Sequence, residues 1–118
     1  MRGNDRDLRV LEHMLTYCGQ IEQTMQRFSA SEACFSQDIV YQNAIALCLL
    51  QIGELVGSLS EEYRAAHREM PWRQIKALRN IIAHHYGVVD AETIWEVIQN
   101  DIPELKAYCQ RALEEAQA

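Results

Sequence analysis

The stretch DRDLRVLEHMLTYCGQIEQTMQRF, residues 5–28, carries the clearest fold signal in the chain. Its apolar residues recur every three or four positions, which places them on one face of an α-helix. They are Leu8, Leu11, Leu15, Cys18, Ile21, Met25 and Phe28. A long helix with one apolar face needs other elements to cover it, so the stretch predicts a helical bundle.

A second helix is expected from about residue 36 to residue 59, antiparallel to the first. Its inward positions are Tyr41, Ile45, Leu49, Ile52, Val56 and Leu59. Serines in residues 29–36 break the helical pattern between the two helices, because their hydroxyl groups compete for backbone hydrogen bonds. Ser60, followed by two glutamates, is typical of a helix N-cap and predicts a short helix to about Glu69.

Two prolines and a glycine indicate where helices begin and end in the second half of the chain. Pro71 suits the first turn of a helix that should end near Gly87, Asp90 can cap the next helix, and Pro103 starts or kinks the last one. The inward residues of these helices are Trp72, Ile75, Leu78, Ile82, Ile94, Trp95, Ile98, Leu105, Tyr108, Cys109 and Leu113. The sequence therefore predicts a single all-α domain over residues 1–118, an up-and-down bundle of four main helices plus a short extra helix.

Composition agrees with one helical domain. A chain of 118 residues with five glycines and two prolines can build one core and is poor in the turn residues of an all-β fold. Cys18, Cys34, Cys48 and Cys109 form no CxxC pair, which favours core thiols in a reducing cytosol. The longest apolar run, residues 44–50, is too short to span a membrane, and the N-terminus lacks a signal-like apolar core. We expect a cytoplasmic protein without a membrane segment.

The charge of the chain is acidic overall but unevenly distributed. A formal net charge of −6 argues against a protein that coats nucleic acid. Residues 64–85, however, hold five basic residues and one acidic residue, whereas residues 1–63 hold four against nine and residues 86–118 hold two against seven. These basic side chains either serve the polar motif within the same segment or offset acidic neighbours in surface pairs.

That motif is Arg79-Asn80-Ile81-Ile82-Ala83-His84-His85-Tyr86. A guanidinium group fits phosphate oxygens, an imidazole can transfer protons near neutral pH, and a phenol can donate, stack or accept a modification. Arg79 borders the apolar stripe of its helix, so it needs a carboxylate partner, a cleft or a second subunit. Together these groups suggest chemistry on a phosphodiester.

Helical geometry separates the two central side chains of the motif. Arg79 and Tyr86 are seven residues apart and share a face, whereas the five-residue step from Arg79 to His84 turns by about 140°. Three arrangements could join them: the last turn loosens before Gly87, the arginine reaches around the helix, or two subunits each contribute a motif. A site completed across a dimer is the sharper hypothesis.

The spacing Arg79, His84, Tyr86 resembles the RX4HXY motif of the HepT-like toxins, which belong to the HEPN group of helical ribonucleases. The similarity covers most of residues 39–110, while the first helix matches only in its apolar pattern. It includes Pro71-Trp72, Leu78-Arg79-Asn80, Ile94-Trp95-Glu96 and Asn100-Asp101-Ile102-Pro103-Glu104-Leu105.

The resemblance implies a metal-independent endoribonuclease without a cofactor, acting as a homodimer whose two motifs line one cleft. It also implies the toxin of a type VII HepT/MntA toxin–antitoxin system. The expected partner is an MntA-like nucleotidyltransferase, which transfers AMP from ATP to Tyr86. Bulk and negative charge added at that tyrosine would fill an RNA-binding cleft and neutralise the enzyme.

In the implied mechanism, His84 takes the proton from a ribose 2′-hydroxyl that attacks the adjacent phosphate, and Arg79 stabilises the transition state. His85, or the partner subunit's His84, could protonate the leaving 5′-oxygen. Asn80 could position the phosphate or bond a backbone carbonyl. The product would carry a 2′,3′-cyclic phosphate, and DNA should resist cleavage.

Other interpretations of the same residues remain open. Arg79 could be a structural ion-pair residue, the two histidines could stabilise the negative end of a helix, and Tyr86 could be a core or interface aromatic. The chain as a whole could be a non-catalytic helical subunit that docks a nucleotidyltransferase. The sequence contains no Glu-x-x-His pair, HExxH motif, Cys/His cluster or phosphate-binding glycine loop, so we expect neither a metal nor a nucleotide cofactor.

Overall fold

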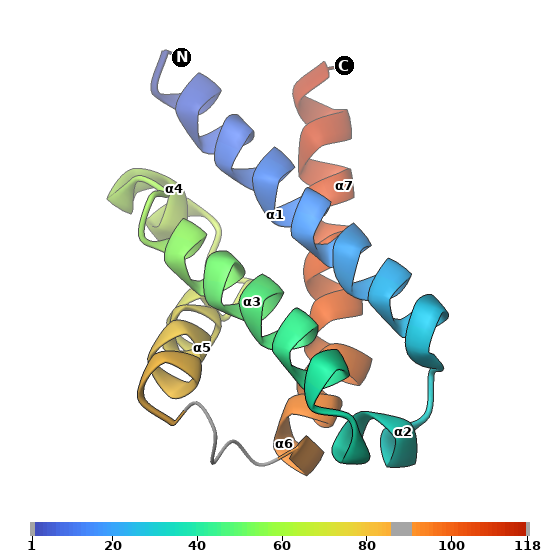
Figure 1. The fold of residues 1–118 in the computed structure, drawn as a ribbon. Coiled ribbons are helices and arrows are strands. Elements are labelled where there is room, and N and C mark those ends of the chain that lie inside the picture. Colours follow the sequence, from blue (N-terminus) through green and yellow to red (C-terminus); the bar gives the residue numbers. More distant parts are fainter. Residues whose placement is uncertain (1, 86–90, 118) are drawn as a thin grey trace.

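The structure is a computed structural model that describes residues 2–85 and 91–117, and this part of the chain is all-α (Figure 1). Four long helices form the bundle: α1 (Arg2–Phe28), α3 (Ile39–Val56), α5 (Trp72–His85) and α7 (Ile102–Gln117). Short helices connect them: α2 (Glu32–Gln37), α4 (Glu61–Ala66) and α6 (Ala91–Glu96), the last followed by a π-helical segment (Val97–Asp101). The predicted fold class is confirmed.

The first two long helices pack antiparallel, as predicted. Figure 1 shows α1 descending toward α2 and α3 returning alongside it, with α7 crossing behind α1. The apolar face predicted for residues 5–28 is buried at its centre, where Leu11, Cys18 and Ile21 have almost no exposed surface. Leu8, Leu15, Met25 and Phe28 are partly buried against the same core. The bundle therefore forms around the stripe that the periodicity identifies.

Helix α3 lies between α1 and α5 and supplies much of the core. All six predicted inward residues, Tyr41, Ile45, Leu49, Ile52, Val56 and Leu59, are buried. The helix ends at Val56, three residues earlier than predicted, so Leu59 lies just beyond it. By length and composition alone α3 could also cross a membrane, since its 18 residues have a mean hydropathy of 1.5. Contacts with α1 and α5 account for this apolar character, because a core helix flanked on two sides needs apolar residues around more of its circumference.

Two N-caps set where α2 and α3 begin, and both starts differ from the sequence prediction. Residues 29–36 are not a simple break, because Ser31 accepts a hydrogen bond from the Cys34 amide and starts α2. Asp38 then accepts hydrogen bonds from the amides of Val40 and Tyr41, so α3 starts at Ile39 and not near residue 36. A six-residue helix buries only Phe35, which is too little for periodicity to reveal.

The predicted N-cap at Ser60 is confirmed and has a partner in α1. The Ser60 side chain accepts a hydrogen bond from the Tyr63 amide, 3.0 Å away. The Asp7 carboxylate, which is buried, accepts hydrogen bonds from the Ser60 amide and hydroxyl, both at 2.8 Å. The start of α1 is thereby tied to the start of α4. Helix α4 ends at Ala66, three residues earlier than predicted.

The second half of the chain follows the predicted order. Helix α5 begins directly after Pro71, and Pro103 lies in the first turn of α7. The predicted helix through Ile98 ends as an α-helix at Glu96 and continues as the π-helical segment, so Ile98 stays buried. The predicted helix stop at Gly87 and the predicted cap at Asp90 lie outside the described residues.

Three of the four thiols belong to the core. Cys18, Cys48 and Cys109 are buried and free, whereas Cys34 is exposed. Burial raises the pKa of the Cys18 and Cys109 thiols to about 12 and that of Cys48 to about 11. At neutral pH these thiols are therefore protonated and behave as small apolar side chains.

Candidate active site

Helix α5 presents Arg79 at the edge of its buried face. Trp72, Ile75, Leu78 and Ile82 recur at helical spacing and are all buried. Arg79 follows Leu78 and keeps 44% of its side chain exposed. The prediction that Arg79 borders the apolar stripe is confirmed. Its side chain is partly packed against the protein and partly exposed to solvent.

The backbone of Arg79 lies directly against α3, at a position that only glycine allows. A Cβ atom added to Gly53 would be 2.7 Å from the Arg79 nitrogen and 2.8 Å from the Arg79 Cβ. Real Cβ atoms do not approach other atoms so closely. Gly53 therefore marks the closest approach of α3 and α5, and this crossing fixes the base of the arginine side chain.

A carboxylate on α3 holds the guanidinium group. Arg79 Nε donates a hydrogen bond to Glu54 Oε2 at 2.7 Å, and Arg79 Nη1 donates to Asn80 Oδ1 at 3.2 Å. Glu54 is 52% exposed, so this ion pair is in contact with water. The charge-assisted bond restrains the arginine on its Nε side. Asn80 Oδ1 thus accepts a hydrogen bond from the arginine, and its expected role, to position phosphate or to bond a backbone carbonyl, stays a prediction.

Sequence reasoning predicted a carboxylate partner for Arg79 as one of three options but did not identify Glu54. The two residues are 25 positions apart, and only the crossing of α3 and α5 brings them together. A signal was nevertheless present, because Glu54 is the one charged residue of α3 and lies off the inward stripe. Gly53 itself was missed for a related reason, since close approach of two helices leaves no mark in a single sequence.

The remaining motif residues are only partly described. Helix α5 is α-helical through His85, so the backbones of His84 and His85 belong to its last turn. Regular helical geometry then keeps the Cα atom of His84 about 140° around the axis from that of Arg79. The histidine side chains and Tyr86 lie outside the described residues. Their roles stay predictions.

An exposed apolar stripe on α3 leads toward the Arg79–Glu54 pair. Ile39, Val40 and Leu47 are 61%, 60% and 57% exposed, which is unusual for large apolar side chains. Val40, Leu47 and Glu54 are seven residues apart, so they follow one another along the same side of the helix. Sequence reasoning overlooked this stripe because it followed only the inward positions of the helix.

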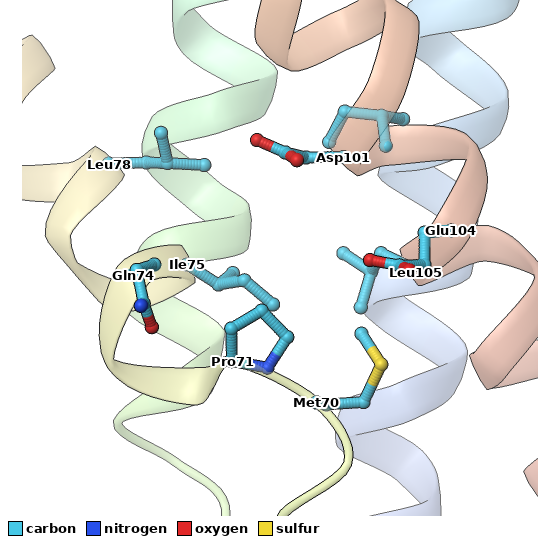
Figure 2. A pocket seen from close by; sticks show the side chains of 9 residues that line it. Met70, Pro71, Gln74, Ile75, Leu78, Asp101, Glu104 and Leu105 are labelled. Carbon is cyan, nitrogen blue, oxygen red and sulfur yellow. The ribbon is translucent and has the colours of Figure 1, made fainter.

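Two of the hollows that described residues line adjoin α5, and the charges of their lining residues differ. Figure 2 shows the first, a cavity of about 280 Å³ with Gln74, Ile75 and Leu78 on the α5 side. Asp101 and Glu104 place carboxylates on its opposite wall, which disfavours a phosphate. The second, of about 470 Å³, lies between α4 and α5 and carries the opposite charge. Its lining residues are Glu61, Arg64, Ala65, Trp72, Arg73 and Lys76.

Among the residues that the structure describes, no three His, Cys, Asp or Glu side chains are grouped so that they could hold a metal ion. The described part of the site therefore offers a cation and hydrogen-bonding groups. A fixed, partly exposed guanidinium group is suited to binding an anionic oxygen.

Comparison with known proteins places this arrangement in a family. The sequence profile described as "Ribonuclease HepT-like" matches residues 14–112. A protein of Caldanaerobacter subterraneus subsp. tengcongensis, provisionally named an RNase, is 34% identical over 104 residues, which span 88% of this chain and 91% of the relative. A protein of Thermococcus cleftensis, provisionally named ribonuclease HepT, is 33% identical over 78 residues, spanning 64% of this chain and 71% of that protein. No solved structure matches the chain.

The helical bundle, the restrained Arg79 and the extent of these matches define an all-α ribonuclease of the HEPN-like class. Within that class, the chain belongs to the HepT-like ribonuclease family.

Proposed function

We propose that this protein is an endoribonuclease that cleaves RNA by attack of a ribose 2′-hydroxyl on the adjacent phosphate, without a metal and in the cytoplasm. The observation that carries the proposal is the fixed position of Arg79, whose backbone rests on Gly53 and whose Nε is bound to Glu54. A cation held in this way can stabilise charge that develops on a phosphate without reorganising first.

The proposed reaction uses groups of the chain alone. His84 removes the 2′-hydroxyl proton while the 2′-oxygen forms a bond to phosphorus, and Arg79 binds the non-bridging oxygens. The bond from phosphorus to the 5′-oxygen breaks, and His85 or the partner subunit's His84 supplies the proton for that leaving oxygen. Positioned proton transfer of this kind contributes roughly 10² to 10⁴ in rate. The products are a 2′,3′-cyclic phosphate and a 5′-hydroxyl.

The proposed active form is a homodimer that pairs through α3. The regular helix through His85 supports this, because it leaves Arg79 and His84 on different sides of one subunit. The exposed Val40 and Leu47 supply an apolar surface that leads to Glu54 beside the arginine. Replacing Leu47 with aspartate should therefore yield a folded monomer in sedimentation equilibrium, and a dimer of unchanged affinity would contradict this surface.

In the cell we propose that the protein is a toxin, with an MntA-like nucleotidyltransferase as its antitoxin and Tyr86 as the acceptor of AMP. A phosphate-bearing adduct at Tyr86 would add bulk and negative charge to the proposed RNA-binding cleft and compete with RNA. Incubation with such a transferase and ATP should add the mass of AMP to the Tyr86 peptide. An unchanged peptide mass would contradict the assignment.

The catalytic proposal is tested with purified protein, RNA and a chelator. The parent should cleave RNA, leave DNA intact and form cyclic phosphate ends, whereas Arg79→Ala and His84→Ala should lose roughly 10² or more in rate. Variants that cleave like the parent would overturn the residue assignment.

A second candidate function is a non-catalytic subunit that docks a nucleotidyltransferase, and the exposed apolar residues of α3 favour it. Stable co-purification with the transferase, together with no cleavage of RNA by the separated protein, would support this alternative.

A further inference from the structure

The second hollow, between α4 and α5, is a cationic surface outside the RX4HXY motif. Three of its lining residues, Arg64, Arg73 and Lys76, are basic, and Glu61 is the acidic one. Trp72 forms a rigid apolar part of its wall, because it is buried and its Nε1 donates a hydrogen bond to the His67 carbonyl oxygen at 2.9 Å. Positive side chains around a preformed hollow are suited to an anionic group.

Surface ion pairs do not account for these basic residues. Within residues 2–85 and 91–117, neither Arg64, Arg73 nor Lys76 forms a salt bridge, whereas Arg79 pairs with Glu54. In that same part of the chain, Arg64 Nε is buried and has no hydrogen-bond partner. Three cations that have no partner among the described residues, in a chain of net charge −6, are available for a ligand.

Basic residues on α5 lead from the hollow toward Arg79. Arg73, Lys76 and Arg79 follow one another at intervals of three residues, which makes them neighbours on the helix surface, with a rise of about 4.5 Å for each step. Lys76 also lies over the end of α3, since its Cε would be 3.9 Å from a Cβ added to Gly57. Glu54, the partner of Arg79, is one helical turn before Gly57.

We propose that Arg73, Lys76 and Arg64 form a subsite for phosphates of single-stranded RNA that flank the cleaved bond. The inference rests on the proposed ribonuclease function and adds where the strand lies: it runs from Arg79 along α5 into the hollow beside α4. Guanidinium groups can bind phosphate oxygens through two hydrogen bonds, and a lysine supplies a mobile point charge. The subsite therefore contributes affinity for the strand and does not touch the reacting atoms.

Binding is tested with a fluorescent 2′-O-methyl oligouridine of about twenty nucleotides, which lacks the attacking hydroxyl. The double variant Arg73→Gln/Lys76→Gln should bind on the order of tenfold more weakly, as expected for two solvent-exposed charge contacts. Its slope of log affinity against log salt should be shallower by about 1.4, because each lost contact to a single strand removes about 0.7. Arg111→Gln on α7 is the matched control, since it removes one exposed positive charge away from the hollow.

Cleavage of RNAs of two lengths separates the subsite from a structural effect. On a twelve-nucleotide RNA the double variant should raise KM and keep kcat, whereas on a dinucleotide, which is too short to reach the hollow, it should match the parent. Equal losses on both lengths, or an unchanged salt slope, would overturn the inference. Thermal melting of both variants checks that they fold.

The two proposals fail in different ways. If the parent cleaves neither RNA but the salt slope still depends on Arg73 and Lys76, the ribonuclease proposal fails and the RNA subsite stands. If the parent cleaves RNA and the double variant behaves like Arg111→Gln in both assays, the subsite fails and the ribonuclease proposal stands.

Discussion

At the scale of single residues, the position of the Arg79 guanidinium group depends most directly on Glu54. The pair is about half exposed, so its contribution to the free energy of unfolding should be small, about 0–1 kcal/mol. Its effect on catalysis can be much larger, because a small misplacement of a catalytic group is costly in rate. In the proposed mechanism, Glu54 would therefore be a positioning residue that acts through Arg79.

Replacing Glu54 with glutamine should therefore lower kcat by roughly tenfold or more while KM and the melting temperature change little. Glutamine keeps the size of the side chain and loses the charge that restrains Arg79 Nε. Steady-state cleavage of a short RNA measures the effect, with Glu62→Gln on exposed α4 as the control. A kcat equal to that of the parent would show that the arginine needs no such anchor.

A second residue-scale prediction concerns Ser29, which has a φ of 122°. This conformation is strained for residues with a Cβ atom, at a cost of about 1–3 kcal/mol. Ser29→Gly should raise the stability measured by urea unfolding by about 1 kcal/mol after the entropy of glycine in the unfolded chain is counted. Ser29→Ala removes the same hydroxyl but keeps the strain, so it should give no such gain. Equal midpoints for both variants would contradict the argument.

At the scale of elements, much of the fold could be predicted because apolar residues recur at regular intervals along the buried face of a helix. Spacing of three and four residues identified the core positions of α1, α3 and α5, and the Ser60 cap identified the start of α4. Helix α2 escaped prediction because its two caps and a single buried Phe35 define it. The exposed Leu47 escaped because an apolar residue beside an apolar stripe looks like core in the sequence alone.

The candidate site divides in the same way. Arg79 could be identified because it lies within eight consecutive residues of His84 and Tyr86, so the spacing of the motif is visible in the sequence alone. Glu54 and Gly53 could not be assigned, because their relation to Arg79 exists only where two helices cross.

The crossing of α3 and α5 supplies the prediction at this scale. Gly53→Ala should destabilise the protein by about 1–3 kcal/mol, because the new methyl group overlaps the Arg79 backbone and forces the helices apart. Cleavage should fall as well, since Arg79 moves with α5. Gly19→Ala is the matched control: nothing lies within 4 Å of its added Cβ, so the same change should stabilise α1 by about 0.5–1 kcal/mol. Similar melting temperatures for the two variants would refute the steric account.

At the scale of the whole molecule, the buried thiols predict how stability depends on pH. Desolvation raises the pKa of Cys18 and Cys109 from 9.0 to about 12 and that of Cys48 to about 11. A thiol whose pKa is higher in the folded state than in the unfolded state contributes to stability. This contribution is fully present at any pH below the pKa of the unfolded state. This contribution is lost as the pH rises from about 9 towards the folded values.

The urea midpoint should therefore fall steadily between about pH 9 and pH 11. Cys18→Ala/Cys109→Ala should weaken that dependence, although the variant is less stable at every pH because it leaves cavities. Cys34→Ser, at the exposed thiol, should retain it. Cys48 remains in this variant, and its raised pKa, together with the pKa values of Tyr41, Tyr63 and Tyr108 that burial also raises, accounts for the slope that remains. A midpoint that stays constant up to pH 11 would contradict this ionisation argument.

The exposed apolar residues of α3 also have a consequence for the cell that produces this protein. If two copies must meet through Val40 and Leu47 before Arg79 of one subunit can act with the partner's His84, the number of active dimers at low abundance rises with the square of the number of copies. A few stray molecules would then stay almost entirely monomeric. A modest rise in synthesis would increase the number of dimers disproportionately.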